Sequence, residues 1–168
     1  GRYFNRFYWI LPDGTHRQYD KRHLFRLGKE WQVFSAGNRK IVIDYKGWNI
    51  CPLICYDLRF PVWSKNRLHN GNYEYDLLLY VANWPEVRKY AWKQLLIARS
   101  IENQAFVGGV NRVGQDGHAI NHSGDSVILN PAGEIIAQAK ANQEEILTAS
   151  ISRSGLEAFR EEFRFGLD

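Results

Sequence analysis

Short runs of hydrophobic residues, each followed by residues that favour turns, predict β-strands in the first and last thirds of the chain. In the clearest case an aromatic run is followed by Leu11-Pro12-Asp13-Gly14, where proline and glycine supply the dihedral angles of a tight reverse turn. Because Pro52 lacks a backbone N–H, we expect its strand to lie at a sheet edge or to contain a bulge there. The strands predicted in these two thirds are residues 3–10, 15–19, 40–45, 48–55, 126–129, 135–139 and 146–151.

The pattern changes in the middle of the chain to strands that alternate with helices. Residues 76–82 are an almost continuous apolar run, which is typical of a central parallel strand covered on both faces. A helix-length segment, residues 87–103, follows, and residues 105–110 form the next predicted strand. Pro61 suits the first position of a short helix, where its missing N–H costs nothing. This alternation predicts an α/β core within a single domain, residues 1–168.

The chain is predicted to end in a helix. Ser154 and Glu157 have the spacing of a capping box, in which a hydroxyl and a carboxylate each accept a hydrogen bond from a backbone amide of the first turn. We expect a helix of about ten residues from this point, close to the usual length in globular proteins. Neither an internal repeat nor a linker interrupts the chain, which supports the single-domain prediction.

Composition and charge narrow the class of protein. The 168 residues are 45% hydrophobic and 24% charged, which is typical of a globular domain. The net charge of +4 comes from scattered basic residues, so we expect neither nucleic acid nor a membrane surface as a partner. Only two cysteines occur, Cys51 and Cys55, too few for a disulfide framework or a four-ligand zinc site. These features favour a soluble protein of the reducing cytoplasm.

Cys55 is the first candidate for catalysis. It ends a predicted buried strand just before a predicted helix, and open α/β sheets bind ligands at the carboxyl ends of their strands. A neighbouring cation or a helix N-terminus would lower the pKa of its thiol and make it nucleophilic. A second interpretation stays open, in which Cys55 is simply a small buried apolar residue, and we expect that role for Cys51.

Four segments of the chain resemble, in the same order, the motifs of the nitrilase superfamily of carbon–nitrogen hydrolases. The short spacing between Lys21 and Cys55, together with Val81-Ala82-Asn83-Trp84-Pro85, is most similar to the bacterial omega-amidases. The four segments are Lys21-Arg22-His23-Leu24-Phe25 for the lysine motif, Cys55-Tyr56-Asp57-Leu58-Arg59-Phe60-Pro61 for the nucleophile motif, Ala98-Arg99-Ser100-Ile101-Glu102-Asn103-Gln104 for a helix motif, and Gly124-Asp125-Ser126 with Pro131-Ala132-Gly133 for a late hairpin.

The resemblance implies a fold, a triad and roles for four residues. The fold is a nitrilase-like four-layer α-β-β-α sandwich, and the triad is Glu–Lys–Cys, acting without metal or organic cofactor. Cys55 corresponds to the nucleophile, Lys21 to the cation that stabilises thiolate and oxyanion, and the backbone N–H of Tyr56 to the second oxyanion donor. Glu30 matches a second carboxylate that orients the site or supports the base, and an ordinary loop glutamate is the equally open alternative.

The triad glutamate has no counterpart in this sequence. In the family it lies on a strand well before the lysine, and residues 1–20 contain no glutamate. The chain also contains no methionine, and its first predicted hairpin has no preceding element to cover its aromatic side chains. We therefore expect the chain to be the C-terminal two-thirds of its domain, with the fold incomplete at the N-terminus.

The implied substrates are small 2-oxo acid amides such as 2-oxoglutaramate and 2-oxosuccinamate, which omega-amidases cleave to the acid and ammonia. Trp84 and Arg112 are candidate substrate-binding residues, with a purely structural role as the alternative for both. Arg59 is expected to be a buried partner of Asp57 or Glu102 rather than a substrate ligand. The family commonly forms dimers through its helical faces, so a homodimer is expected.

Three other functions stay open at this point. A cysteine–histidine protease or transferase could use His23, His118 or His122 as its base. Another amidase or a nitrilase of the same superfamily would use the same triad on a different substrate. A nitrilase-like fold could also serve assembly without catalysis, which the absent glutamate favours and the intact Lys21 and Cys55 oppose.

Overall fold

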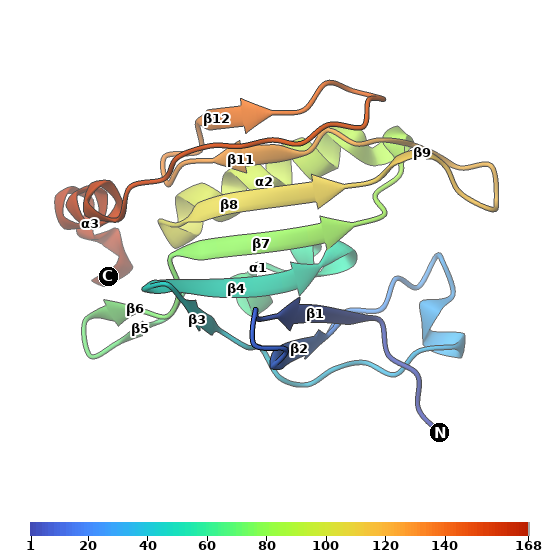
Figure 1. Cartoon of the computed structure of the whole chain (residues 1–168), viewed down its shortest axis with the longest axis horizontal. Coiled ribbons are helices and arrows are strands. Elements are labelled where there is room, and N and C mark those ends of the chain that lie inside the picture. Colours follow the sequence, from blue (N-terminus) through green and yellow to red (C-terminus); the bar gives the residue numbers. More distant parts are fainter. Residues whose placement is uncertain (168) are drawn as a thin grey trace.

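A six-stranded sheet in the order β12-β11-β8-β7-β4-β3 forms the centre of the molecule (Figure 1). The structure is a computed structural model and describes residues 1–167. The three inner strands β4, β7 and β8 run parallel, and the outer strands join them antiparallel. The strands are β3 (Ile43–Tyr45), β4 (Trp48–Ile54), β7 (Leu77–Ala82), β8 (Phe106–Asn111), β11 (Val127–Leu129) and β12 (Ile135–Gln138).

Helix α2 (Lys89–Asn103) covers the sheet and lies behind β8 and β11 in Figure 1. Trp92 and Leu96 on α2 are fully buried, and they contact β8 at Gly109, where the missing side chain leaves room for them. Leu78 and Val107 on the neighbouring strands are equally buried. The sequence-predicted α/β core is therefore confirmed, with the helix starting two residues later than expected because a 3-10 turn, η3 (Glu86–Arg88), precedes it.

Three hairpins and several short helices lie outside the six-stranded sheet. The predicted first hairpin is confirmed as β1 (Arg6–Ile10) and β2 (His16–Asp20), and β1 contacts β4 (Figure 1). Two short hairpins were not predicted, because neither contains an apolar run of strand length. They are β5 (Leu68–His69) with β6 (Asn72–Tyr73), and β9 (Val113–Gln115) with β10 (Asn121–Ser123). The remaining short helices are η1 (Glu30–Gln32), η2 (Cys55–Arg59), α1 (Pro61–Ser64) and η4 (Arg164–Leu167).

Pro52 occupies the position that its missing N–H requires. The β3–β4 ladder ends at the pair Ile43–Ile50, so at Pro52 the strand β4 is paired only with β7. Pro61 is the first residue of α1, as predicted. Both prolines therefore lie where no backbone hydrogen bond has to be given up.

Two sequence predictions in the last part of the chain are wrong. Residues 146–151 do not form a strand: Ile146 is 93% exposed, and in the described chain no neighbouring strand pairs with this segment. The C-terminal helix α3 (Arg153–Glu162) has the expected ten residues, but its N-cap is Ser152, whose hydroxyl accepts a hydrogen bond from the N–H of Gly155 at 3.1 Å. Ser154 and Glu157 lie inside the helix and form no capping box.

The α/β fold class is confirmed, and the described residues contain one six-stranded mixed sheet with helix α2 packed against it. Both cysteines are free thiols, and Cys51 is fully buried in the core, as expected. In the part of the chain that the structure describes, the helices are all too short or too polar to cross a membrane.

Candidate active site

Cys55 lies at the carboxyl ends of the parallel strands. It follows β4 directly and opens η2 with a left-handed backbone angle φ of 46°. For a residue other than glycine this conformation costs about 1–3 kcal/mol, and such strain is concentrated at functional sites. The Sγ atom lies 3.9 Å from the carbonyl oxygen of Asn83, which follows β7. Cys55 is thus held at the edge of the sheet where α/β proteins bind their ligands.

A buried side chain of α2 holds the turn that carries Cys55 by a hydrogen bond. Arg99 is 3% exposed, and its guanidinium donates a hydrogen bond to the carbonyl oxygen of Leu58 at 2.6 Å. The same guanidinium is paired with Glu102 at 3.0 Å. Because Arg99 and Leu58 are both buried, this contact fixes η2 relative to the helix.

Lys21 is 1% exposed, which is rare for lysine. Its Nζ donates hydrogen bonds to both carboxylate oxygens of Glu30, at 2.8 and 2.7 Å. Glu30 also accepts a hydrogen bond from the N–H of Phe25 at 2.8 Å, so its carboxylate is held in place by the same loop. The two candidate residues before Cys55 therefore form one ion pair, in which Lys21 is buried and the side chain of Glu30 is 21% exposed.

Burial and nearby charges act in opposite directions on the Cys55 thiol. Burial raises the pKa of the thiol, the positive charge of Lys21 lowers it, and the negative charges of Glu30 and Asp57 raise it. The net shift is upward, whereas the sequence analysis expected a cation and a helix N-terminus to lower this pKa. The largest cause is burial, which disfavours the charged thiolate, and Glu30 also offsets part of the effect of Lys21. Because the pKa of the thiol is raised, the attack of Cys55 on an amide requires a base.

A pocket of about 210 Å³ contains Cys55. Its aromatic wall includes Tyr56 and the indole of Trp84, which is 3% exposed. Two arginines also line it: the guanidinium of Arg59 lies 5.0 Å from the ring centre of Trp84, and that of Arg88 lies 5.4 Å from the ring centre of Phe25. Among the described residues, neither guanidinium has a hydrogen-bond or ion-pair partner. The pocket therefore holds two guanidinium groups without an ion-pair partner and one carboxylate, that of Asp116, beside a thiol.

The expectation for Arg59 is wrong. Arg59 is exposed at the pocket and pairs with neither of the carboxylates named for it. Asp57 accepts its hydrogen bonds from Tyr19, His23 and a backbone amide, and Glu102 is paired with Arg99. Since both carboxylates already have partners, the guanidinium of Arg59 pairs with neither and lines the pocket.

Arg112 lies outside this pocket. It is exposed, its guanidinium donates to the carbonyl oxygen of Gln115 at 2.9 Å, and it lines a neighbouring hollow that shares only Asn83 with the Cys55 pocket. Arg88, by contrast, lines the pocket and was missed by the sequence analysis, because its segment was interpreted only as a helix start. The aromatic ring beneath it, Phe25, belongs to the lysine motif and could have signalled the contact.

The three histidines considered as alternative bases differ in position. His23 donates or accepts at Nδ1 with Asp57 at 2.8 Å and does not line the Cys55 pocket. His118 and His122 do line it, and Nδ1 of His122 lies 3.0 Å from the carbonyl oxygen of Ile120. His122 is 2% exposed, so its ring is held in the pocket wall.

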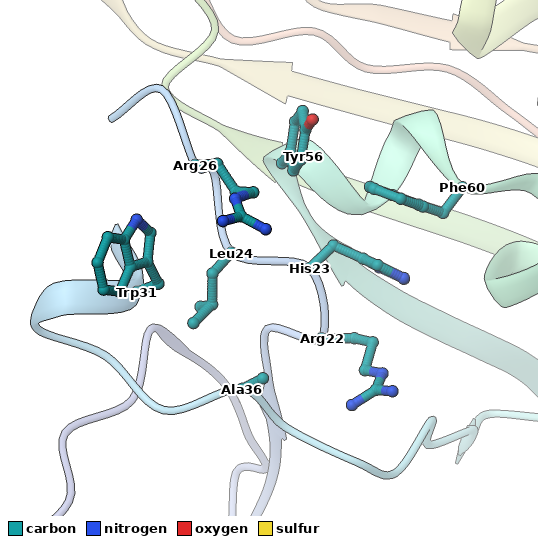
Figure 2. A pocket seen from close by; sticks show the side chains of 8 residues that line it. All are labelled: Arg22, His23, Leu24, Arg26, Trp31, Ala36, Tyr56 and Phe60. Carbon is teal, nitrogen blue, oxygen red and sulfur yellow. The ribbon is translucent and has the colours of Figure 1, made fainter. Parts of the chain in front are cut away.

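A second, more open pocket of about 540 Å³ lies on the other side of Tyr56, which lines both (Figure 2). Figure 2 shows Arg22, Arg26 and Trp31 around it. Its lining does not contain Cys55, so the smaller pocket is the candidate active site, and the Lys21–Glu30 pair lines neither pocket.

Comparison with known proteins gives close relatives over most of the chain. The family model described as carbon-nitrogen hydrolase matches residues 1–161. The chain is 52% identical over 159 residues to the protein named omega-amidase YafV of Escherichia coli K12, a match that covers 95% of this chain and 60% of that protein. It is 38% identical over 135 residues to the protein named 2-oxoglutaramate amidase of Bacillus subtilis, covering 80% and 50% respectively. The chain thus spans three fifths or less of the length of these relatives.

Solved structures of nitrilase superfamily proteins have a similar fold. A carbon–nitrogen hydrolase superfamily protein of Xanthomonas campestris, which holds an arsenic adduct in its active site, superposes with a TM-score of 0.96 at 46% identity. That match covers 98% of this chain and 63% of the other. Nit3 of Saccharomyces cerevisiae, a member of branch 10 of the nitrilase superfamily, superposes with a TM-score of 0.83 at 25% identity, covering 96% of this chain and 58% of that one.

Proposed function

This chain belongs to the carbon–nitrogen hydrolase family, and from that premise we propose that the protein hydrolyses the terminal amide of small 2-oxo acid amides to the acid and ammonia. The observation that carries the proposal is the pair of unpartnered guanidinium groups, Arg59 and Arg88, in the pocket of Cys55. Substrates such as 2-oxoglutaramate and 2-oxosuccinamate carry a carboxylate at the end opposite the amide, and arginine binds carboxylates bidentately. The names of two relatives support the same substrate class.

The size of the pocket supports a small substrate. Its volume of about 210 Å³ lies below the roughly 300–1,000 Å³ typical of pockets for drug-sized ligands. Trp84 and Tyr56 form an apolar wall along which the carbon chain of such an amide would lie. We assign the substrate carboxylate to Arg59 and Arg88 rather than to Arg112, because Arg112 lines the neighbouring hollow.

The chemistry is a two-step acyl transfer through Cys55. A base removes the Sγ proton, and the sulfur attacks the amide carbon while the carbonyl oxygen becomes an oxyanion. The ammonium of Lys21 and the backbone N–H of Tyr56 stabilise this oxyanion. The C–N bond then breaks, the amine takes the proton from the base and leaves as ammonia, and a thioester remains. Water attacks the thioester, the C–S bond breaks, and the acid leaves as the thiol is restored.

The base is a glutamate outside these 168 residues, as the family resemblance implies, and residues 1–168 form the C-terminal two-thirds of the catalytic domain. Glu30 orients the ammonium of Lys21 and limits its charge, a role supported by its two hydrogen bonds to Nζ. The raised pKa of the Cys55 thiol supports the need for a separate base.

The protein acts in the cytoplasm and forms a homodimer in this proposal. Two free thiols, one of them fully buried, are compatible with a reducing compartment. Val62 on α1 and Tyr90 on α2 are 82% and 76% exposed, and these two helices contact each other on the helical side of the sheet. Large exposed apolar side chains on one face are typical of a protein interface.

The test of the activity uses protein in which residues 1–168 are joined to the segment that supplies the glutamate. We expect it to release ammonia from 2-oxoglutaramate, and Cys55→Ala to reduce the rate by roughly 10⁴-fold or more, since the covalent step is lost. Ammonia is measured with a coupled enzyme, and far-UV circular dichroism checks the fold.

Cys51→Ala is the matched control, because Cys51 lies in β4, the strand that directly precedes Cys55, and is buried in the core. We expect it to leave the rate within about threefold, since it lies outside the pocket and a core change of this size acts mainly on stability. Undiminished ammonia release by Cys55→Ala would rule out the mechanism, and wild-type protein that is inactive on every 2-oxo acid amide would rule out the substrate class.

A further inference from the structure

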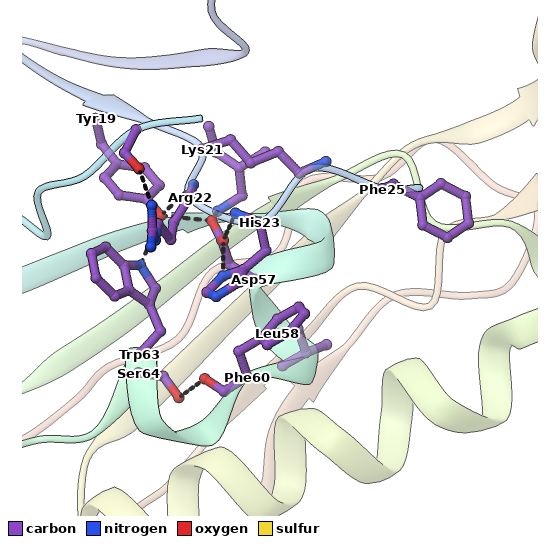
Figure 3. A network of polar contacts seen from close by, with 12 residues as sticks. Tyr19, Lys21, Arg22, His23, Phe25, Asp57, Leu58, Phe60, Trp63 and Ser64 are labelled. Atoms are coloured by element: carbon purple, nitrogen blue, oxygen red, sulfur yellow. Dashed lines mark hydrogen bonds and ion pairs between the residues drawn. The ribbon is translucent and has the colours of Figure 1, made fainter. Parts of the chain in front are cut away.

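The side chain of Asp57 is completely buried and takes no part in the acyl transfer described above. Its carboxylate accepts four hydrogen bonds (Figure 3). Oδ1 accepts from the backbone N–H of His23 at 2.9 Å and lies 2.8 Å from Nδ1 of the same residue. Oδ2 accepts from the hydroxyl of Tyr19 at 2.7 Å and from the N–H of Ile54 at 3.2 Å. A buried carboxylate with this many donors costs little to keep charged.

The donors come from the two segments that carry the proposed catalytic pair. Ile54 immediately precedes Cys55, and Tyr19 and His23 lie two residues before and two residues after Lys21. One carboxylate therefore ties the strand end that presents the thiol to both sides of the loop that presents the ammonium. Figure 3 shows the loop and the turn meeting at Asp57.

Each donor is itself fixed by aromatic neighbours. The His23 ring stacks on Phe60 with ring centres 3.6 Å apart and planes 6° from parallel. The Tyr19 hydroxyl accepts a hydrogen bond from Nε1 of Trp63 at 2.9 Å. Burial and the charge of Asp57 raise the pKa of Tyr19, so its hydroxyl stays protonated and continues to donate. The connection is thus rigid on both sides of Asp57.

We propose that Asp57 is a positioning residue that sets the distance between Nζ of Lys21 and Sγ of Cys55. The proposal rests on the roles assigned to Lys21 and Cys55 in the proposed function. The stabilisation of a thiolate by an ammonium falls with their separation, and more steeply where water is excluded. If the Asp57 contacts are lost, the loop of Lys21 moves relative to the thiol, and the thiolate becomes harder to form.

The substitution Asp57→Asn distinguishes a positioning role from a direct electrostatic effect, because the two shift the pKa of the Cys55 thiol in opposite directions. The negative charge of Asp57 raises the pKa of the Cys55 thiol, so removing that charge alone would lower this pKa. Loss of positioning would raise it, because Lys21 would act from further away. The other charged or titratable groups around the thiol stay unchanged in this variant. They are Lys21, Glu30, Arg59, Arg88, Asp116, His118 and His122.

The experiment measures the rate of iodoacetamide alkylation of Cys55 against pH, followed by mass spectrometry of the Cys55 peptide. We expect Asp57→Asn to raise the midpoint of the pH profile by about one unit, which lowers the alkylation rate at pH 7 roughly tenfold. Asp44→Asn is the matched control, since Asp44 is exposed on β3, and it should leave the profile unchanged. A midpoint that falls or stays constant in folded Asp57→Asn overturns the proposal.

A second pair of variants keeps the charge of Asp57. If Asp57→Asn fails to fold, this pair tests whether the contacts of Asp57 position Lys21 relative to Cys55. His23→Asn retains an N–H donor near the place of Nδ1, whereas His23→Ala removes it. We expect His23→Ala to raise the midpoint and His23→Asn to restore most of the wild-type profile. Equal profiles for the two variants contradict the proposal, because both remove the same ring and any ring charge.

Turnover separates failure of this proposal from failure of the proposed function. Alkylation needs no amide substrate, so a shifted profile in a protein that hydrolyses no 2-oxo acid amide supports the role of Asp57 and rejects the substrate class. In an active protein, we expect Asp57→Asn to lower kcat while KM stays within about twofold, since the pocket arginines are untouched. A raised KM with constant kcat would overturn the positioning role and leave the amidase activity standing.

Discussion

Cys55, Lys21 and Arg59 take their properties from neighbours that are distant in the chain. The thiol of Cys55 is desolvated by the surrounding core and feels both members of the Lys21–Glu30 pair, so its pKa rises. Arg59 faces the pocket because Asp57 is already saturated by other donors. The chemistry that each side chain can perform was predictable from its residue type. The pKa of Cys55 and the orientation of the Arg59 side chain were not.

Arg59→Ala tests the binding of the substrate carboxylate. We expect KM for 2-oxoglutaramate to rise roughly 10- to 100-fold with kcat little changed, because a hydrogen bond to a charged group contributes about 1.5–3 kcal/mol. Steady-state kinetics with a neutral aliphatic amide of similar length should show no such rise in KM.

Arg67→Ala is the matched control for that change, since Arg67 is exposed and does not line the Cys55 pocket. Its KM should equal that of the unmodified protein. If Arg59→Ala weakens charged and neutral amides equally, Arg59 supports the pocket wall and does not bind the carboxylate.

The strands and helices were predicted correctly where nearby residues determine them. The predictions failed where an element depends on a pairing strand or a cap that the sequence does not reveal. The Pro-Gly turn between β1 and β2, the apolar run of β7 and the length of α2 all follow from nearby residues. Residues 146–151 have a strand-like composition, but a strand exists only when a neighbour completes its ladder, and no strand of the described chain pairs with them. The N-cap of α3 shows the same limit, since Ser152 and Ser154 are both plausible caps in sequence.

Gly109 tests the packing of α2 on β8. A Cβ at this position would lie 2.5 Å from Cδ1 of Leu96 and 3.0 Å from Trp92. We expect Gly109→Ala to lower the free energy of unfolding by about 1–3 kcal/mol, because the added methyl group overpacks the core. Urea denaturation measures the change.

Gly117→Ala is the comparison for that variant, because a Cβ there meets nothing within 4 Å. It should change the free energy of unfolding by less than about 0.5 kcal/mol. An unchanged stability of Gly109→Ala would show that the helix moves freely away from the strand.

The whole molecule combines the strand edge that carries Cys55 with a partly exposed helical face. Cys55 lies where the parallel strands end, whereas Tyr90 and Ile101 lie on one face of α2. Tyr90 and Ile101 are 76% and 45% exposed. The proposed dimer would cover this face and leave the pocket of Cys55 within each subunit.

Tyr90→Glu tests the dimer. We expect sedimentation velocity to show a shift from dimer to monomer, because a charge at the centre of an apolar interface stays unpaired when buried. Tyr3→Glu is the control, since Tyr3 is 71% exposed at the other end of the chain. If both variants sediment as the unmodified protein does, the helical face is not the interface.

The sequence by itself determined the α/β class, the hairpins with strong turns, the family and the identity of Cys55 and Lys21 as the candidate pair. These follow from local periodicity and from motifs whose residues are close together in the chain. Only the tertiary structure decided that Glu30 binds Lys21, that Arg59 and Arg88 face the pocket, and that Asp57 joins the segments of Lys21 and Cys55. The reason is that burial, desolvation and charge pairing are sums over residues that only folding brings together.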